Sequence, residues 1–133
     1  MILYNGQSLA YIGDAIYELR IREHILEKGY QDVNILHKHA VKFTSGESQA
    51  KIIEYLLAEN FLSEEEISYF KRGRNSGHSK NRRSISVISY KKATGFEAMI
   101  GYLYLENKKE RLDELLEHII KIVEEGLIWQ EKA

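Results

Sequence analysis

The chain has 133 residues, of which 44% are hydrophobic and 29% are charged, and this composition is typical of one folded domain of ordinary size. Cysteine is absent, which excludes disulfides and cysteine-based metal sites or nucleophiles. No apolar run approaches the length that spans a bilayer, and the first ten residues lack a signal-peptide pattern, so we expect a cytoplasmic protein that does not enter the membrane.

The formal net charge of -1 argues at first against a nucleic-acid partner, but the charges are unevenly distributed. Positions 71–92 hold eight Lys or Arg residues and no Asp or Glu, so the rest of the chain carries 11 basic and 20 acidic residues. A basic segment in an acidic body indicates a localised electrostatic surface.

Apolar residues recur every three or four positions along most of the chain, which predicts an all-α fold in a single domain over 1–133. The absence of proline agrees with successive uninterrupted helices. Asp32 or Asn34 can cap the second helix, and Ser63 with Glu66 forms a capping box for the fourth. We expect a basic loop over 74–89 and helices over about 6–28, 32–42, 45–59, 63–73, 90–107 and 109–127.

Two of these helices each contain one acid in an otherwise apolar stretch. Asp14 is the only charged residue of 9–17, and Glu97 is the only one of 93–105. Helices that are apolar nearly all round are usually buried, and a buried carboxylate needs a proton, a partner or a metal. The first helix is expected to pack through one stripe, with Asp14 roughly opposite it; the stripe is Leu9, Ile12, Ile16, Leu19 and Leu26.

The two acids can meet if their helices approach closely, which Gly13 and Gly101 would permit. Clustered carboxylates repel one another, and a divalent cation such as Mg²⁺, which prefers oxygen ligands, relieves that repulsion. Bound Mg²⁺ can activate water and stabilise charge on a phosphate. Alternatively, each acid accepts hydrogen bonds from a neighbouring helix or pairs with a buried Arg, and periodicity leaves both possibilities open.

Four segments in order resemble the ribonuclease III family. LAYIGDAIYE at 9–18 is similar to its signature helix, and TGFEAMIGYLYLE at 94–106 to its second acidic helix. LHKHAVKFTSGESQAKII at 36–53 and KRGRN at 71–75 resemble segments of the mini-ribonuclease III branch, which is a stand-alone catalytic domain.

The resemblance implies a homodimeric all-α domain of the ribonuclease III type that cuts double-stranded RNA with Mg²⁺ and leaves 5′-phosphate ends. It makes Asp14 and Glu97 the catalytic, metal-binding residues. Members of the mini branch mature the precursor of 23S ribosomal RNA, helped by a ribosomal protein on the substrate. Larger relatives carry further acids where this chain has Ala10 and Thr94, which leaves the number of metal ions open. Glu18 could assist through water, although a surface role fits it better.

No separate double-stranded-RNA-binding domain is expected after the sixth helix, so the catalytic dimer itself must grip RNA. Duplex RNA is recognised mainly through phosphates, 2′-hydroxyls and shape, which suits mobile basic side chains. The expected RNA-binding residues are Lys71, Arg72, Arg74, Asn75, His78, Lys80, Arg82 and Arg83. The alternative is an ordinary solvated basic surface.

Two functions follow from these observations. The first is a Mg²⁺-dependent endoribonuclease. The second is a non-catalytic RNA-binding module of the same fold, which the loss of acids at Ala10 and Thr94 would favour. Retention of Asp14 and Glu97 argues for the enzyme, because a pure binder could replace both with apolar residues. A helical protein-interaction adaptor would leave the basic segment unexplained.

Overall fold

The computed structural model describes residues 4–76 and 86–129. All the regular secondary structure of these residues is helical, with no strand among them, which confirms the all-α prediction. None of the helices described is long and apolar enough to cross a membrane. The elements are α1 (Gly6–Glu27), α2 (Val33–Thr44), α3 (Gly46–Ala58), α4 (Glu64–Arg74), α5 (Val87–Leu105), α6 (Lys109–Glu124) and the short 3-10 helix η1 (Leu127–Trp129).

Local capping signals fix most helix starts. The Asp32 side chain accepts from the backbone N–H of Asn34 and Ile35, and the Ser63–Glu66 capping box is complete, so both predictions are confirmed. The predicted loop over 74–89 was wrong at its end. There α5 begins at Val87, because the Ser86 hydroxyl caps it by accepting from the Ser89 N–H at 3.1 Å.

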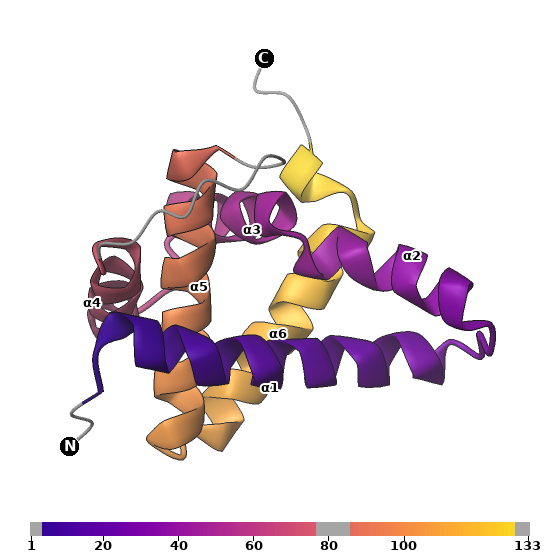
Figure 1. The fold of residues 1–133 in the computed structure, drawn as a ribbon, viewed down its shortest axis with the longest axis horizontal. Helices are drawn as coiled ribbons and strands as arrows, with labels where there is room; N and C mark the ends of the chain where they lie inside the picture. The colour runs from indigo at the N-terminus through magenta and orange to yellow at the C-terminus, as the bar shows by residue number, and fades with distance from the viewer. Residues whose placement is uncertain (1–3, 77–85, 130–133) are drawn as a thin grey trace.

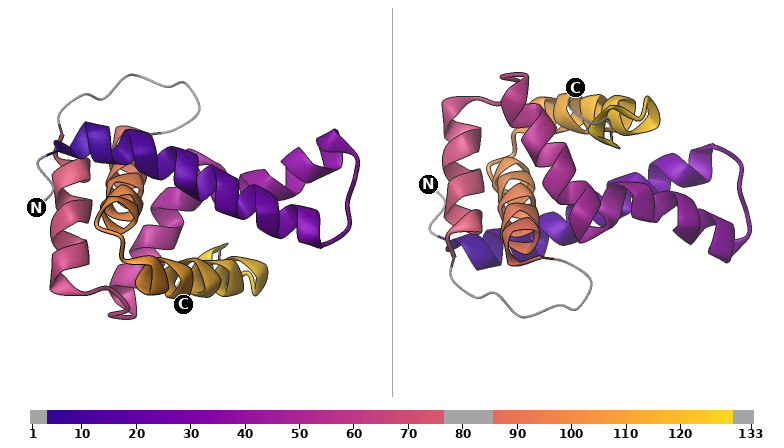
Figure 2. Two further views of the ribbon diagram at one scale, coloured as in Figure 1. Left: turned by 90° about the horizontal axis from the view of Figure 1, so that it is seen from below. Right: turned by 90° about the horizontal axis from the view of Figure 1, so that it is seen from above.

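The central helix is α5, which contacts α1, α3, α4 and α6 (Figure 1). Across it lies α1, while α4 runs beside it, as both views of Figure 2 show. Beyond this crossing α1 projects with α2, forming an arm on one side of the molecule (Figure 1). The fold therefore brings the N-terminal half of α1 and the middle of α5 together.

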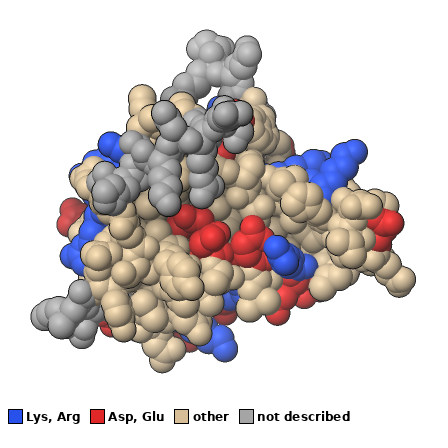
Figure 3. Space-filling view, in the orientation of Figure 1, with Lys and Arg blue, Asp and Glu red and all other residues tan. Residues whose placement is uncertain are grey.

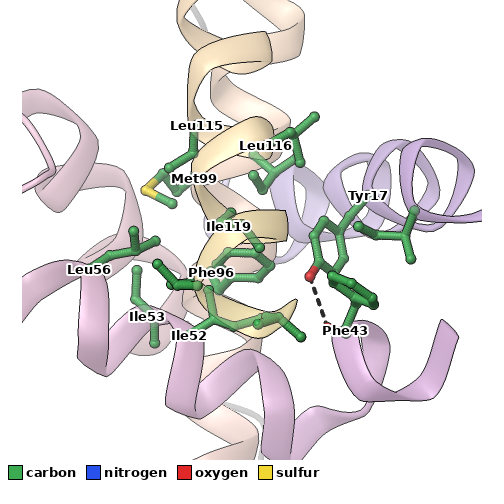
Figure 4. Packing of buried hydrophobic residues seen from close by; sticks show 14 of the residues in the cluster. Tyr17, Phe43, Ile52, Ile53, Leu56, Phe96, Met99, Leu115, Leu116 and Ile119 are labelled. Carbon is green, nitrogen blue, oxygen red and sulfur yellow. Dashed lines mark hydrogen bonds between the residues drawn. The ribbon is translucent and has the colours of Figure 1, made fainter. Parts of the chain in front are cut away.

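The main core lies between α5, α3, α6 and the inner side of α1. Phe96 and Met99 of α5 meet Ile52 and Leu56 of α3 there, and all four are fully buried (Figure 4). The Tyr17 ring packs edge-on against Phe96, with centroids 4.9 Å apart. This core holds α1 at a fixed position on α5.

The predicted apolar stripe of α1 was wrong. Of its members, Leu9 is buried, but Leu19 and Leu26 are 55% and 57% exposed. The buried face is instead Gly6, Leu9, Ala10, Gly13, Tyr17, Ile21 and Ile25. The physical reason is that apolar residues surround α1 over positions 9–17, so periodicity could not distinguish the face that packs on α5.

Candidate active site

A cleft of about 470 Å³ opens where α1, α5 and the junction of α2 with α3 meet. Figure 3 shows acidic side chains gathered in the middle of this face of the molecule. The cleft is lined by four carboxylate residues, Asp14, Glu18, Glu47 and Glu97. The other lining residues are Thr44, Ser45, Gly46, Gln49, Tyr90, Ala93 and Thr94.

Asp14 and Glu97 reach the same cleft because α1 and α5 touch through their backbones. A Cβ atom added to Gly13 would lie 1.8 Å from the backbone oxygen of Glu97, and one added to Gly101 would lie 2.0 Å from that of Leu9. No side chain fits at either position. The predicted close approach through these two glycines is confirmed, and it sets one acid on each side of the contact.

The two acids differ in burial. Glu97 is half-buried, but Asp14 is exposed, so the prediction that both acids lie in buried helices was wrong for Asp14. Asp14 lies at the edge of the α1 face that packs on α5, one residue past the buried Gly13. Asp14 forms no ion pair with a described residue, so the structure provides no buried Arg for it.

Tyr17 connects the floor of the site to the next helix. It is fully buried, and its hydroxyl donates to the Phe43 backbone oxygen at 2.8 Å, as the dashed line in Figure 4 marks. Burial, and then the negative charges of Glu18 and Glu97, raise the pKa of Tyr17 well above its usual value. The phenol is therefore a neutral donor that fixes the end of α2, and with it the α2–α3 junction, against α1.

The α2–α3 junction adds residues that sequence analysis missed. Ser45 ends α2 and caps α3, where its hydroxyl accepts from the Ser48 N–H at 3.1 Å. This turn sets Glu47 and Gln49 on the wall of the cleft, and Gln49 is only 3% exposed. The sequence contains no signal for Gln49, because its neighbours in α3 are mostly polar and its place in the cleft depends on tertiary packing.

The chemistry of the lining suits a hard divalent cation. Carboxylate, hydroxyl and amide oxygens are the ligands that Mg²⁺ prefers. Among the described residues, however, no three Asp, Glu or His side chains lie close enough together to form a complete metal site. Asp14 and Glu97 could thus anchor a cation whose other ligands are water and phosphate oxygens.

The structure describes four of the eight residues predicted to bind RNA. Arg72 stacks on the Tyr69 ring with its guanidinium carbon 4.7 Å from the centroid, and Arg74 lies 5.4 Å from that of Phe70. Asn75 is the C-cap of α4 and accepts from Arg74 Nε at 3.2 Å. Lys71 is exposed. The other four, His78, Lys80, Arg82 and Arg83, lie outside the described residues.

Comparison with known proteins connects this site to a family. The model of the Ribonuclease III domain matches residues 7–108, a segment that contains both acids and the α1–α5 contact. A Mini-ribonuclease 3 of Enterococcus faecalis is 44% identical over 91% of this chain and 92% of its own length. One of Acholeplasma laidlawii is 42% identical over 92% of this chain and 96% of its own length.

The chain belongs to the ribonuclease III family, within its mini-ribonuclease III branch. A crystal structure of a Fusobacterium nucleatum protein has the same fold, with a TM-score of 0.80 and 36% identity over 90% of this chain and 93% of that one. This membership makes the chain an endoribonuclease acting on double-stranded RNA, and the family is generally metal-dependent.

This ribonuclease III domain has Ala10 and Thr94 at the two positions where larger relatives carry further acids. Ala10 is buried and packs in a small cluster with Leu9 and with Ala98 of α5. Thr94 lines the cleft, and its hydroxyl donates to the Tyr90 backbone oxygen at 3.0 Å. With these two positions occupied by Ala and Thr, the carboxylates that line the cleft are Asp14, Glu18, Glu47 and Glu97.

Proposed function

We propose that this ribonuclease cuts duplex RNA with Mg²⁺ held by Asp14 and Glu97. The observation that supports the proposal is the shared cleft, in which the glycine contact between α1 and α5 sets the two acids side by side with oxygen-bearing groups around them. When bound there, Mg²⁺ supplies an activated water and neutralises charge on the scissile phosphate.

The protein's own residues orient the reaction. Asp14 is exposed and Glu97 is half-buried, so the two carboxylates would hold the cation between solvent and the interior of the cleft. The α1–α5 contact fixes the backbone positions of the two acids, and pre-organised geometry lowers the barrier for attack. Glu18 and Glu47 add negative charge at the rim, which raises the local concentration of cations.

The grip on RNA is proposed to come from the basic end of α4 and the segment that follows. The cationic groups of Lys71, Arg72 and Arg74 suit phosphate oxygens, and Asn75 suits a sugar or phosphate contact. His78, Lys80, Arg82 and Arg83 complete the proposed set. Gly73, within this end of α4, packs against Thr94 and Gly95 of α5. The basic end of α4 is therefore held against the helix that carries Glu97.

A homodimer is the proposed assembly, with one cleft in each protomer and one strand cut in each. Large apolar side chains are exposed on α1 and at the end of α5, including Tyr11 at 83%, Leu19 at 55% and Tyr104 at 49%. Exposed apolar groups of this size on one small domain are typical of a protein interface.

Within this activity, the proposed substrate is the precursor of 23S ribosomal RNA, with a ribosomal protein on the substrate as a helper.

The deciding experiment incubates the purified chain with a long RNA duplex and Mg²⁺, beside Asp14→Asn and Glu97→Gln. We expect each variant to lose at least about 100-fold in cleavage rate, because each removes an anchor of the cation. A chelator should abolish cleavage by the wild type. Glu23→Gln is the matched control, since Glu23 is an exposed acid of α1 outside the cleft, and it should cleave normally.

Salt-sensitive binding of the duplex without cleavage, unchanged by Asp14→Asn, would refute the metal-dependent mechanism. That outcome would support the RNA-binding module instead, for which Ala10 and Thr94 are the specific observation. Cleavage that persists in the chelator would equally rule out Mg²⁺ as the cofactor.

A further inference from the structure

Gln49 is a buried polar residue in the wall of the cleft. Its side chain is 3% exposed and belongs to the first turns of α3. The Nε2 group donates to the Thr44 backbone oxygen at 3.2 Å, but Oε1 is buried and has no hydrogen-bond partner among the described residues. A buried acceptor without a donor carries a desolvation penalty, which offsets the stability that the bond to Thr44 contributes.

The identity of the unpaired atom follows from chemistry. A backbone carbonyl can only accept, so the amide nitrogen of Gln49 must face Thr44. Turning the amide over would set two acceptors against each other and would leave the nitrogen unpaired instead. The atom without a partner is therefore the oxygen, and the partner it lacks is a donor.

The proposed function identifies which donors reach this cleft. Along a nucleic-acid backbone, phosphate and ring oxygens only accept hydrogen bonds, whereas the ribose 2′-hydroxyl also donates. The second source of an O–H donor is water carried by the cation between Asp14 and Glu97. Both donors arrive only when RNA and metal are bound.

We propose that Gln49 is a substrate-contact residue whose side-chain oxygen accepts a hydrogen bond from an O–H group that enters the cleft with duplex RNA. The group is the 2′-hydroxyl beside the scissile phosphate or water on the cation. Because the oxygen is covered in this structure, the cleft wall around Gln49 must open slightly for the donor to reach it, while Nε2 keeps its bond to Thr44. This assignment rests on the proposed function.

The test is a double-mutant cycle between the protein and the RNA. Gln49→Met keeps the size of the side chain and removes both amide groups. It is compared with the wild type on an all-ribose duplex and on duplexes carrying one 2′-deoxy substitution at each position near the cut. If the 2′-hydroxyl is the donor, one substitution slows the wild type on the order of fivefold. Gln49→Met is then slow on the all-ribose duplex and is not slowed further by that substitution.

If water on the cation is the donor, the pattern differs. Gln49→Met then needs on the order of fivefold more Mg²⁺ for its half-maximal rate. Every 2′-deoxy substitution slows it by the same factor as the wild type. Additive effects at all positions with an unchanged Mg²⁺ requirement would overturn the proposal and make Gln49 a purely structural residue.

Unfolding of the protein without RNA or metal separates a contact role from misfolding. Ser48→Ala is the control, since Ser48 is 1% exposed on the same turn but does not line the cleft. Its hydroxyl bonds with that of Ser45 at 2.8 Å, so Ser48→Ala should lose stability and keep the 2′-deoxy and Mg²⁺ responses of the wild type. Gln49→Met removes the donor to the Thr44 oxygen and should also lose stability, so only an altered 2′-deoxy or Mg²⁺ response distinguishes it from Ser48→Ala. A wild type that cannot cut the all-ribose duplex would refute the proposed function, whereas normal cutting without coupling would refute only the role of Gln49.

Discussion

Gly13 packs directly on the backbone oxygen of Glu97, where an added Cβ atom would lie only 1.8 Å from it. Asp14 follows Gly13, so the closest contact between α1 and α5 lies beside both proposed metal-binding residues. The geometry of the site is thus fixed by the absence of a side chain rather than by a bond between the acids.

Gly13→Ala should lower both stability and cleavage. Within a helix this change normally adds up to about 1 kcal/mol of stability, because alanine is the better helix former. The methyl group would instead push α5 away, and overpacking of this kind costs about 1–3 kcal/mol. Urea unfolding measures the net sign, and single-turnover cleavage measures the effect on the site. Glu23→Ala, an exposed site on the same helix, should change neither by much. A stabilised, fully active Gly13→Ala would show that the helices separate freely.

Two buried tyrosines provide a matched pair of substitutions. Tyr17 and Tyr102 are 0% and 1% exposed, but only the Tyr17 hydroxyl has a partner among the described residues, the Phe43 backbone oxygen. Tyr17→Phe should cost about 1–3 kcal/mol, because it leaves that buried carbonyl without a donor, whereas Tyr102→Phe should cost almost nothing. Chemical unfolding compares the two. Equal losses would mean that the bond from Tyr17 does not secure the α2–α3 junction.

The helices and several of their caps could be predicted because their signals are local. Asp32 and the Ser63–Glu66 box act within a few residues of the chain, and both form as predicted. The end of the loop before α5 was misjudged because Ser86 is a cap without an apolar pattern around it. Local sequence thus determined where helices begin better than it determined which side of each helix is buried.

The site could be predicted only in part. Asp14 and Glu97 stood out as single acids in apolar stretches, and Gly13 and Gly101 suggested how they meet. The exposure of Asp14 was missed because apolar residues surround α1 on sides that the single chain leaves open, among them Tyr11 and Leu19. Glu47 and Gln49 were missed because the α2–α3 junction reaches the cleft through tertiary packing alone.

Glu66 should contribute stability that acid removes. It is 3% exposed, and Arg111 donates to it through Nε at 2.7 Å and Nη2 at 2.9 Å. Burial alone would raise the pKa of Glu66, but the hydrogen bonds from Arg111 and the Ser63 N–H outweigh burial and lower the pKa. A carboxyl whose pKa is lowered by folding stabilises the protein above its unfolded pKa of about 4.3. That stability is lost as the pH falls through the lowered, folded value.

Glu66→Gln should therefore cost about 1–3 kcal/mol near pH 7, because Arg111 loses a charged hydrogen-bond partner but keeps Glu114 and the Phe61 oxygen. The loss should shrink when unfolding is measured progressively below about pH 4. Glu65→Gln is the control, since Glu65 is exposed and lies 3.5 Å from Lys108, so it should cost less than about 1 kcal/mol. A difference between Glu66→Gln and the wild type that did not depend on pH would show that the charge of Glu66 contributes nothing.

The basic end of α4 should be detectable in the salt dependence of RNA binding. Each phosphate contact releases counterions, so the logarithm of the affinity falls with the logarithm of salt by about 0.7 to 0.9 per contact. Lys71→Gln, Arg72→Gln and Arg74→Gln should each weaken binding of a duplex and reduce that slope by nearly one, whatever the sequence of the duplex. Lys121→Gln, a basic site on α6, should leave the slope unchanged.

Arg72 tests the idea most strictly, because its stacking on Tyr69 also holds the end of α4. Arg72→Lys keeps the charge and weakens the stacking, so a slope lost in Arg72→Gln and kept in Arg72→Lys would assign the effect to a phosphate contact.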